Sequence, residues 1–376
     1  MRQEMQQARR VVIKLGTGLL TKKDGGVAAS RLGKLVSQCA HLVQKEGKKI
    51  ILVSSGAVGL GRISLGIQNL SDVSSKQACA AVGQGLLMQR YQRYFARHGL
   101  MTAQLLVTAD DFSDRRRYLN LRETFERLLS YNVIPVVNEN DSVSTMELQE
   151  DSRTHSFGDN DLLSALVASK LGADLLLILT DVDGIYDSHP KKNPSAKPIA
   201  ELDDFDDLKK LDLKGQSAYG RGGVSSKIEA ARLASLGGVS TVIASGLKND
   251  AILQCAGTLV RPKLKLKDRQ LWIGHSSGYG GVIQINRGAA EALIKKKASL
   301  LPSGVTGVRG SFGANEVVSV ETEQGREIGR GIVYFSAHQI AEIQGCHSRK
   351  ISEKLGKTDH QEIIHRDHLV IFGENG

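Results

Sequence analysis

The first two thirds of the chain alternate short apolar runs with longer amphipathic stretches, and this alternation constrains the fold more than any other feature. The apolar runs have the length of strands, and the predicted strands are Val11–Leu15, Ile50–Val53, Thr102–Val107, Val133–Val137, Leu175–Thr180 and Thr241–Ala244. The stretches between them carry apolar residues at helical spacing, and the predicted helices are Arg31–Glu46, Lys76–His98, Arg117–Ser130, Asp161–Lys170 and Ser225–Ser235. Strands that alternate with helices form a mainly parallel sheet covered on both faces, which is a three-layer α/β architecture.

The pattern changes near Lys263, where helical stretches become rare and glycines frequent. Short alternating runs such as Val282–Ile285 and Val317–Val320 predict a second, small, β-rich and barrel-like domain. We therefore expect a first domain over residues 1–262, a linker over 263–275 and the second domain over 276–376.

The composition is that of a globular protein, with 376 residues of which 41% are hydrophobic and 24% charged. No apolar run reaches the roughly 18 residues that span a bilayer. The four cysteines are far apart and include no Cys-x-x-Cys pair, which favours reduced thiols and a cytoplasmic location. The net charge of +10 suits a nucleic acid, but it equally suits anionic substrates such as nucleotides.

Polar motifs follow the predicted strands. They occupy Lys14–Thr17, Ser54–Ala57, Asn138–Asp141 and Thr180–Gly184. In sheets of this kind ligands bind outside the carboxyl ends of the strands, so loops that are far apart in sequence meet at one edge. This convergence indicates an enzyme.

Two lysines, Lys14 and Lys227, stand beside glycines that could follow a strand or precede a helix. Backbone N–H groups at such places bind anions, and two cations among them suit phosphoryl transfer, in which charge and position hold the moving group. Either lysine alone could also be a surface residue beside a turn. Neither fits the Walker A spacing, so the chain is not a P-loop enzyme.

Three further motifs each allow two interpretations. In Gly158-Asp159-Asn160-Asp161, Asp159 or Asn160 could cap a helix, while Asp161 could pair with both lysines. Gly56–Gly61 is either a strand-to-helix turn or a backbone cradle for a carboxylate or phosphate, and its spacing is not that of a dinucleotide-binding fingerprint. Asn138–Asp141 is either a solvated loop or a site at which Asp141 recognises a substrate ammonium group.

Several other kinds of site are excluded. Thr180–Gly184 lacks the ligand spacing of a calcium loop. The ten histidines show no metal-ligand spacing, and no Gly-x-Ser-x-Gly elbow of a serine hydrolase is present.

The ordered set of motifs resembles the amino acid kinase superfamily over the first domain. The residues that carry this resemblance are Val12-Ile13-Lys14-Leu15-Gly16-Thr17, Ser55-Gly56-Ala57, Ser75-Lys76-Gln77, Ala80–Gln84, Asn138–Asp141, Gly158–Asp161, Thr180-Asp181 and Gly222–Lys227. The second domain resembles a PUA domain. The residues that match it are Gly281–Ile283, Gly288-Ala289, Ser299–Gly304, Val308, Gly310, Phe312, Gly329 and Gly331.

Within the superfamily, the combination of a kinase domain with a PUA domain resembles one branch of enzymes. That branch phosphorylates the γ-carboxylate of L-glutamate, the first step of proline biosynthesis. The resemblance implies an αβα sandwich of the amino acid kinase type, with ATP as co-substrate and Mg²⁺ on its phosphates. It also implies feedback inhibition by L-proline and a homo-oligomer, a dimer or tetramer formed through the kinase domain. RNA binding through the PUA domain stays open, and no membrane partner is expected.

The resemblance also implies roles for individual residues. Lys14 would contact the transferred phosphoryl group, Lys227 would stabilise charge on the nucleotide phosphates, and Asp161 would organise the two lysines. The residues implied to bind glutamate are Ser55, Gly56, Asp141 and Asn160. The residues implied to bind ATP are Lys14, Gly16, Thr180, Asp181, Arg221, Gly222, Gly223, Val224, Ser225, Ser226 and Lys227. No metal ligand on the protein itself is implied.

The chain departs from the pattern at three places. Arg221 stands where a small residue is common, Val224 stands where Met is frequent, and the segment Ser144–Phe157 looks long. Two competing functions remain. The first is phosphorylation of N-acetylglutamate, aspartate or UMP, as in a sister kinase, and a panel of substrates would test it. The second is RNA binding through the PUA domain, and a salt-dependent gel shift would test it.

Overall fold

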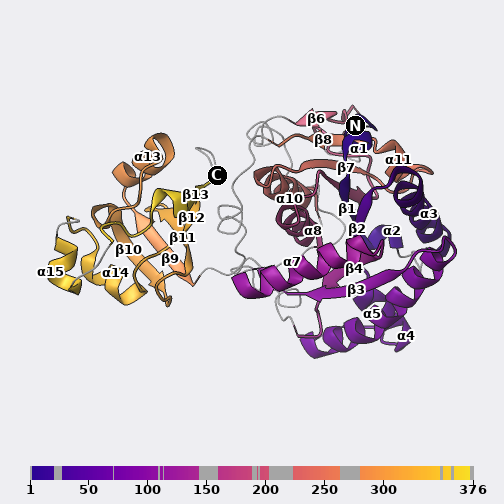
Figure 1. Cartoon of the computed structure of the whole chain (residues 1–376), viewed down its shortest axis with the longest axis horizontal. Helices are drawn as coiled ribbons and strands as arrows, with labels where there is room; N and C mark the ends of the chain where they lie inside the picture. Colours follow the sequence, from indigo (N-terminus) through magenta and orange to yellow (C-terminus); the bar gives the residue numbers. More distant parts are fainter. Residues whose placement is uncertain are drawn as a thin grey trace. The chain divides into compact units, whose positions relative to one another are not determined.

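The computed structural model describes residues 2–20, 28–70, 72–108, 111–112, 114–143, 160–188, 193, 195–202, 223–262, 280–347, 350–356 and 360–372. The chain divides into two compact units, Met1–Leu266 and Lys267–Gly376 (Figure 1). The predicted linker over 263–275 lies outside the described residues, so the predicted domain boundaries stay a prediction. No helix among the described residues combines the length and the apolar character needed to cross a membrane.

The first unit is built on an eight-stranded sheet. Its strands, in spatial order, are β3 (Thr102–Val107), β4 (Ile134–Glu139), β2 (Lys49–Ser54), β1 (Arg10–Leu15), β5 (Leu175–Thr180), β7 (Ser240–Ser245), β8 (Gly257–Val260) and β6 (Glu201–Leu202). Among these described strands every neighbouring pair is parallel except β7 and β8, which are antiparallel. The mainly parallel sheet expected from the sequence is therefore confirmed.

Helices cover both faces of this sheet, as Figure 1 shows. One core contains side chains of α1 (Arg2–Gln7), α2 (Thr17–Leu20), α3 (Ala29–Glu46), α4 (Ala57–Ser64), α5 (Val73–Ala96) and α11 (Ala251–Gln254). The other core contains side chains of α7 (Arg115–Ser130), α8 (Asn160–Lys170) and α10 (Val224–Leu236). Along β1, Ile13 and Leu15 belong to the first core and Val12 to the second, as strand alternation requires. The three-layer architecture is confirmed.

The five predicted helices each begin one to three residues earlier than their apolar pattern indicated, and an aspartate caps two of them. The carboxylate of Asp72 accepts from Ser75 N at 2.8 Å at the start of α5. The carboxylate of Asp114 accepts from Arg117 N at 2.8 Å at the start of α7. Each cap satisfies a backbone N–H that the helix itself leaves unpaired, so the first turn forms ahead of the apolar residues.

The glycines after β2 form a turn and then a closely packed helix. Gly56 has a φ of 101°, which favours glycine, and α4 begins at the next residue. A Cβ atom on Gly61 would lie 1.8 Å from Cys79 O, and one on Gly83 would lie 1.8 Å from Ala57 O. Gly61 and Gly83 therefore allow the backbones of α4 and α5 to approach each other closely, which the sequence analysis did not predict.

The second unit contains a five-stranded mixed sheet. Its strands, in spatial order, are β10 (Val305–Gly310), β9 (Gly281–Ile285), β11 (Val317–Thr322), β12 (Glu327–Ile332) and β13 (Leu369–Ile371). Only β9 and β11 are parallel among these described strands. The helical elements of this unit are α13 (Arg287–Lys296), η1 (Pro302–Gly304), α14 (Ala337–Ile343), α15 (Ile351–Leu355) and η3 (Arg366–His368). The β-rich second domain is confirmed, and its ten-residue helix α13, capped by Asn286, was not predicted.

Candidate active site

Three buried charged side chains meet at the carboxyl edge of the large sheet. Lys14 Nζ lies 2.7 Å from Asp161 Oδ1, and Lys227 Nζ lies 3.0 Å from Asp161 Oδ2. The exposed fractions are 5% for Lys14, 0% for Asp161 and 6% for Lys227. Lys14 is two residues after Val12 on β1, so its side chain is on the sheet face that α8 and α10 cover. The fold therefore brings β1, α8 and α10 together through one carboxylate.

The two lysines keep the Asp161 carboxylate ionised. Burial raises the pKa of Asp161, but the charges of Lys14 and Lys227 and their hydrogen bonds outweigh burial, so the pKa lies below its ordinary value. Ser226 Oγ also donates to Asp161 Oδ2, at 3.0 Å. The three charged side chains together carry one net positive charge, which suits an anion such as a phosphoryl group.

The start of α8 also contacts the loop after β2. Asn160, the first residue of α8, donates through Nδ2 to Ser55 Oγ at 2.9 Å, and both residues are buried. Asn160 Oδ1 has no hydrogen-bond partner in the part of the chain that the structure describes. Asp159 lies outside that part. Ser55, Gly56 and Asn160, which the resemblance assigns to one ligand, are thus brought to one place beside Asp161.

Three of the four residues of the Asn138–Asp141 stretch are buried, so its interpretation as a solvated loop is wrong. Asn138 and Glu139 end β4, and Asp141 lies two residues beyond it. Glu139 and Asp141 line a small cavity together with Gln84 of α5. Two carboxylates beside a cavity suit a ligand with an ammonium group.

The residues expected on the nucleotide side lie at the ends of β1 and β5. Gly16 N donates to Leu179 O at 3.3 Å, and a Cβ on Gly16 would lie 3.3 Å from the same oxygen and 3.6 Å from Lys14 Nζ. Thr180 Oγ1 donates to Asp181 Oδ1 at 3.1 Å. Glycine at position 16 therefore leaves the space next to Lys14 open to a ligand.

The first turn of α10 carries the remaining expected residues. Gly223 occupies the N-cap position without a capping side chain, and Val224, Ser225, Ser226 and Lys227 follow it. Backbone N–H groups at such a helix start have no partner within the helix and attract anions. Arg221 and Gly222 lie outside the described residues, as does the segment Ser144–Phe157.

Comparison with known proteins identifies the family. The amino acid kinase family profile matches residues 9–245. Glutamate 5-kinase of Caldanaerobacter subterraneus subsp. tengcongensis is 42% identical over 371 residues, which cover 96% of this chain and 98% of that protein. Glutamate 5-kinase of Trichlorobacter lovleyi is 42% identical over 377 residues, which cover 98% of each chain. This chain belongs to the glutamate 5-kinase family.

The second unit of this member of the glutamate 5-kinase family is matched by the PUA domain profile over residues 281–355. Among solved structures, UMP kinase from Ureaplasma parvum aligns with 68% of this chain and 99% of its own, with 14% identity and a TM-score of 0.47.

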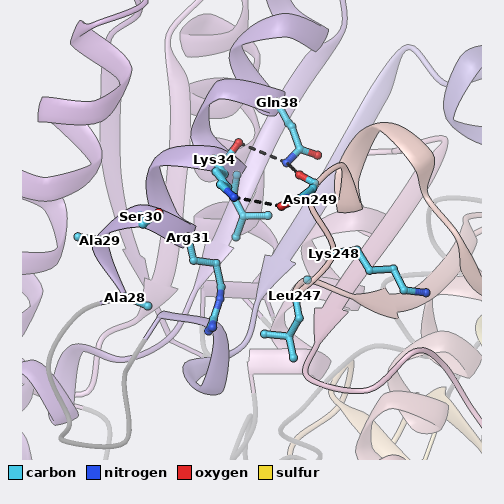
Figure 2. Close-up of a pocket in the computed structure, with 11 residues that line it drawn as sticks. Ala28, Ala29, Ser30, Arg31, Lys34, Gln38, Leu247, Lys248 and Asn249 are labelled. Atoms are coloured by element: carbon cyan, nitrogen blue, oxygen red, sulfur yellow. Dashed lines mark hydrogen bonds between the residues drawn. The ribbon is translucent and has the colours of Figure 1, made fainter.

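A larger cavity of about 310 Å³ lies between the start of α3 and the loop after β7, and Figure 2 shows the residues around it. None of the residues predicted for the glutamate 5-kinase site is among its described lining residues. Lys34 Nζ donates to Asn249 Oδ1 at 3.0 Å, and Gln38 Nε2 donates to Asn249 O at 3.0 Å. Arg31 reaches the other way and donates to Leu19 O at 3.1 Å. These side chains hold α2 and the loop after β7 against α3, and no sequence motif pointed to them.

Proposed function

We propose that the first unit transfers the γ-phosphoryl group of ATP to the γ-carboxylate of L-glutamate, giving L-glutamyl 5-phosphate and ADP. This reaction is the first step of proline biosynthesis. The observation that carries the proposal is the single buried carboxylate of Asp161, which holds Lys14 and Lys227 on its two oxygens at 2.7 and 3.0 Å. Family membership selects the substrates, and this geometry fits the chemistry.

The reaction needs charge neutralisation more than proton transfer. A carboxylate is already ionised at pH 7, so its oxygen attacks the γ-phosphorus without a general base while the bond from phosphorus to the bridging oxygen breaks. Two anions must be held together, and preorganised cations lower the free energy of the transition state in which they meet. Lys14 would contact the transferred group, Lys227 would stabilise the charge that develops on the departing ADP, and Asp161 positions both.

The family resemblance implies that magnesium is carried on the triphosphate. The carboxylate of Asp161 is bound to the two lysines and would not be a ligand of the ion. When it is bound, Mg²⁺ would neutralise phosphate charge, while the side chains and backbone amides of this chain orient the reacting groups.

The glutamate side would lie over α8 and the loops after β2 and β4. Ser55, Gly56 and Asn160 are brought together there, with Asn160 Nδ2 2.9 Å from Ser55 Oγ. Asp141 is buried beside a cavity and would bind the α-ammonium group. The ATP side would lie over Gly16, Thr180, Asp181 and residues 221–227.

Hydroxylamine trapping tests the proposal directly. The purified protein is incubated with ATP, Mg²⁺, hydroxylamine and L-glutamate, with aspartate and N-acetylglutamate in parallel. We expect glutamyl hydroxamate from L-glutamate alone, because the trap captures the acyl phosphate before its own α-amine cyclises. Product from N-acetylglutamate or aspartate alone would assign the chain to a sister kinase activity, and no product from a folded, ATP-binding protein would contradict the proposal.

Feedback inhibition by L-proline, assembly into a dimer or tetramer, and RNA binding through the PUA domain stay predictions from the family resemblance. A proline titration of the same hydroxamate assay addresses the first. Loss of activity at millimolar proline would support it, and unchanged activity would contradict it.

A further inference from the structure

A buried pair of amide side chains lies between α5 and the end of β4. Asn138 Nδ2 donates to Gln84 Oε1 at 3.0 Å, and both residues are almost fully buried, with exposed fractions of 2% and 6%. This bond leaves Gln84 Nε2 and Asn138 Oδ1 without a hydrogen-bond partner in the described residues. Buried polar atoms are costly when unpaired and are usually satisfied by protein, water or ligand, so two such atoms in one place indicate a binding position.

The unpaired amide donor belongs to a residue that lines a cavity of the candidate active site. Gln84, Glu139 and Asp141 line the same small cavity, with Ala80 of α5 on its wall. Glu139 and Asp141 supply negative charge, which suits an ammonium group but opposes a carboxylate. A ligand that carries both groups on one carbon therefore needs a hydrogen-bond donor for its carboxylate on this wall.

The cavity offers the complement of an α-amino acid. Among the described residues, the hydrogen bond between the two amides leaves Gln84 Nε2 as an unpaired donor, and Gln84 lines the cavity. A zwitterionic head group presents an acceptor, the carboxylate, and a donor, the ammonium group. The donor of Gln84 matches the carboxylate, and the carboxylates of Glu139 and Asp141 on the same cavity match the ammonium group, so the complement is an amino acid.

We infer that Gln84 binds the α-carboxylate of the amino acid substrate through its side-chain amide, with Asn138 fixing the orientation of that amide. This inference rests on the proposed function and adds a subsite to it. The sequence motif Ala80–Gln84 contains the residue, but the resemblance gave it no role. Gln84 thereby sets the preference for a substrate with an α-carboxylate.

Calorimetric binding to the variant Gln84→Met tests the subsite, because methionine keeps the length of the side chain and removes its polar atoms. Dissociation constants are measured for L-glutamate and for 4-aminobutyrate, with Mg²⁺ and β,γ-imido-ATP present to prevent turnover. 4-Aminobutyrate keeps the reacting carboxylate and the ammonium group but lacks the α-carboxylate. We expect Q84M to weaken L-glutamate binding by about 10- to 100-fold, the scale for a hydrogen bond to a charged group, and 4-aminobutyrate binding less than about threefold.

The variant Tyr91→Phe is the matched control. Tyr91 lies two helical turns further along α5 and its hydroxyl is 2.7 Å from Ser54 Oγ, also buried against the sheet. Y91F should leave both dissociation constants within about twofold, since it removes a buried polar contact of α5 that no substrate group replaces.

Two results would overturn the subsite. One is a Q84M variant whose dissociation constants for L-glutamate and 4-aminobutyrate rise by the same factor, which is the outcome of a purely structural role. The other is a Q84M variant that binds L-glutamate as the wild type does. Hydroxamate formation by the wild-type protein separates these cases from failure of the proposed function, because wild-type protein that neither binds L-glutamate nor forms hydroxamate refutes both.

Discussion

Lys227 Nζ and Asp161 Oδ2 lie 3.0 Å apart, and the hydroxyl of the preceding residue, Ser226, donates to the same oxygen at 3.0 Å. Two neighbouring residues of α10 thus contact one carboxylate at the start of α8. This double contact fixes the first turn of α10 against α8, and Lys14 contacts the other oxygen from β1. The arrangement makes the position of each lysine depend on Asp161, because neither ammonium group can move away without leaving a buried charge unbalanced.

Lys227 is expected to act on the chemical step. Replacing it with alanine should lower kcat at least ~100-fold, the scale for losing one preorganised charge-stabilising group, while the fold persists. Initial rates in the hydroxamate assay and a circular dichroism spectrum measure this. Lys248→Ala is the matched control, since Lys248 is an exposed lysine paired with Asp183 at 3.2 Å. A folded K227A variant that keeps activity within twofold would refute the role.

Asp141 is expected to act on substrate binding. Asp141→Ala removes a buried carboxylate from the cavity beside Gln84, so the KM for L-glutamate should rise by at least about tenfold while the KM for ATP changes little. Steady-state kinetics with each substrate varied in turn measure the two constants. An unchanged KM for L-glutamate would assign this loop to another task.

The ionised state of Asp161 links stability to acid pH. Its pKa is lower in the folded protein than the ordinary 3.8, so it contributes stability that is fully present above that value. The contribution is lost as the pH falls through the folded pKa, where the carboxylate gains a proton and its bonds to Lys14 and Lys227 weaken. Denaturant unfolding of the wild type and of Asp161→Asn between pH 6 and pH 2.5 measures it.

The wild type should be more stable than D161N at pH 6, by about 3–5 kcal/mol if the variant leaves two uncompensated buried cations. The difference in unfolding free energy should shrink as the pH falls below 3.8. A difference that stays constant over the whole range would show that Asp161 is not the titrating group. Ser164→Ala serves as a control, because the Ser164 hydroxyl donates to the backbone oxygen of Asp161, at 2.6 Å, and not to its carboxylate.

Six strands of the large sheet could be predicted to within one or two residues, because a parallel strand buried on both faces is an uninterrupted apolar run, while the short β6 and the antiparallel β8 were not predicted. Leu175–Thr180 illustrates this, since all six residues are buried. Helix starts were less predictable, since α5 and α7 begin at caps that precede their apolar faces. Helix α13 was missed because its ten residues lie in a glycine-rich region and bury only Ala290 and Leu293.

The meeting of Lys14, Asp161 and Lys227 could be anticipated from the family resemblance and from the carboxylate of Asp161, which a helix cap at Asp159 or Asn160 would leave available to both lysines. Gln84 could be found only within a motif, and Gln38 not at all. A buried amide leaves no periodic signal in a sequence, since its role depends on which backbone groups the fold brings to it. Both residues therefore needed the structure.

Gln38 is expected to stabilise the fold without affecting catalysis. Its Oε1 accepts from Ile252 N at 2.9 Å and its Nε2 donates to Asn249 O at 3.0 Å, so it holds the loop after β7 and the start of α11 against α3 (Figure 2). Gln38→Leu would leave these buried backbone groups unpaired and should lower the free energy of unfolding by about 2–3 kcal/mol. Urea denaturation measures this loss, and Lys34→Ala, which removes an exposed contact to Asn249, should cost less than about 1 kcal/mol. At a temperature where Q38L remains folded, its kcat and its KM for L-glutamate should stay within about twofold of the wild-type values. A large rise in the KM with unchanged stability would place Gln38 in the active site instead.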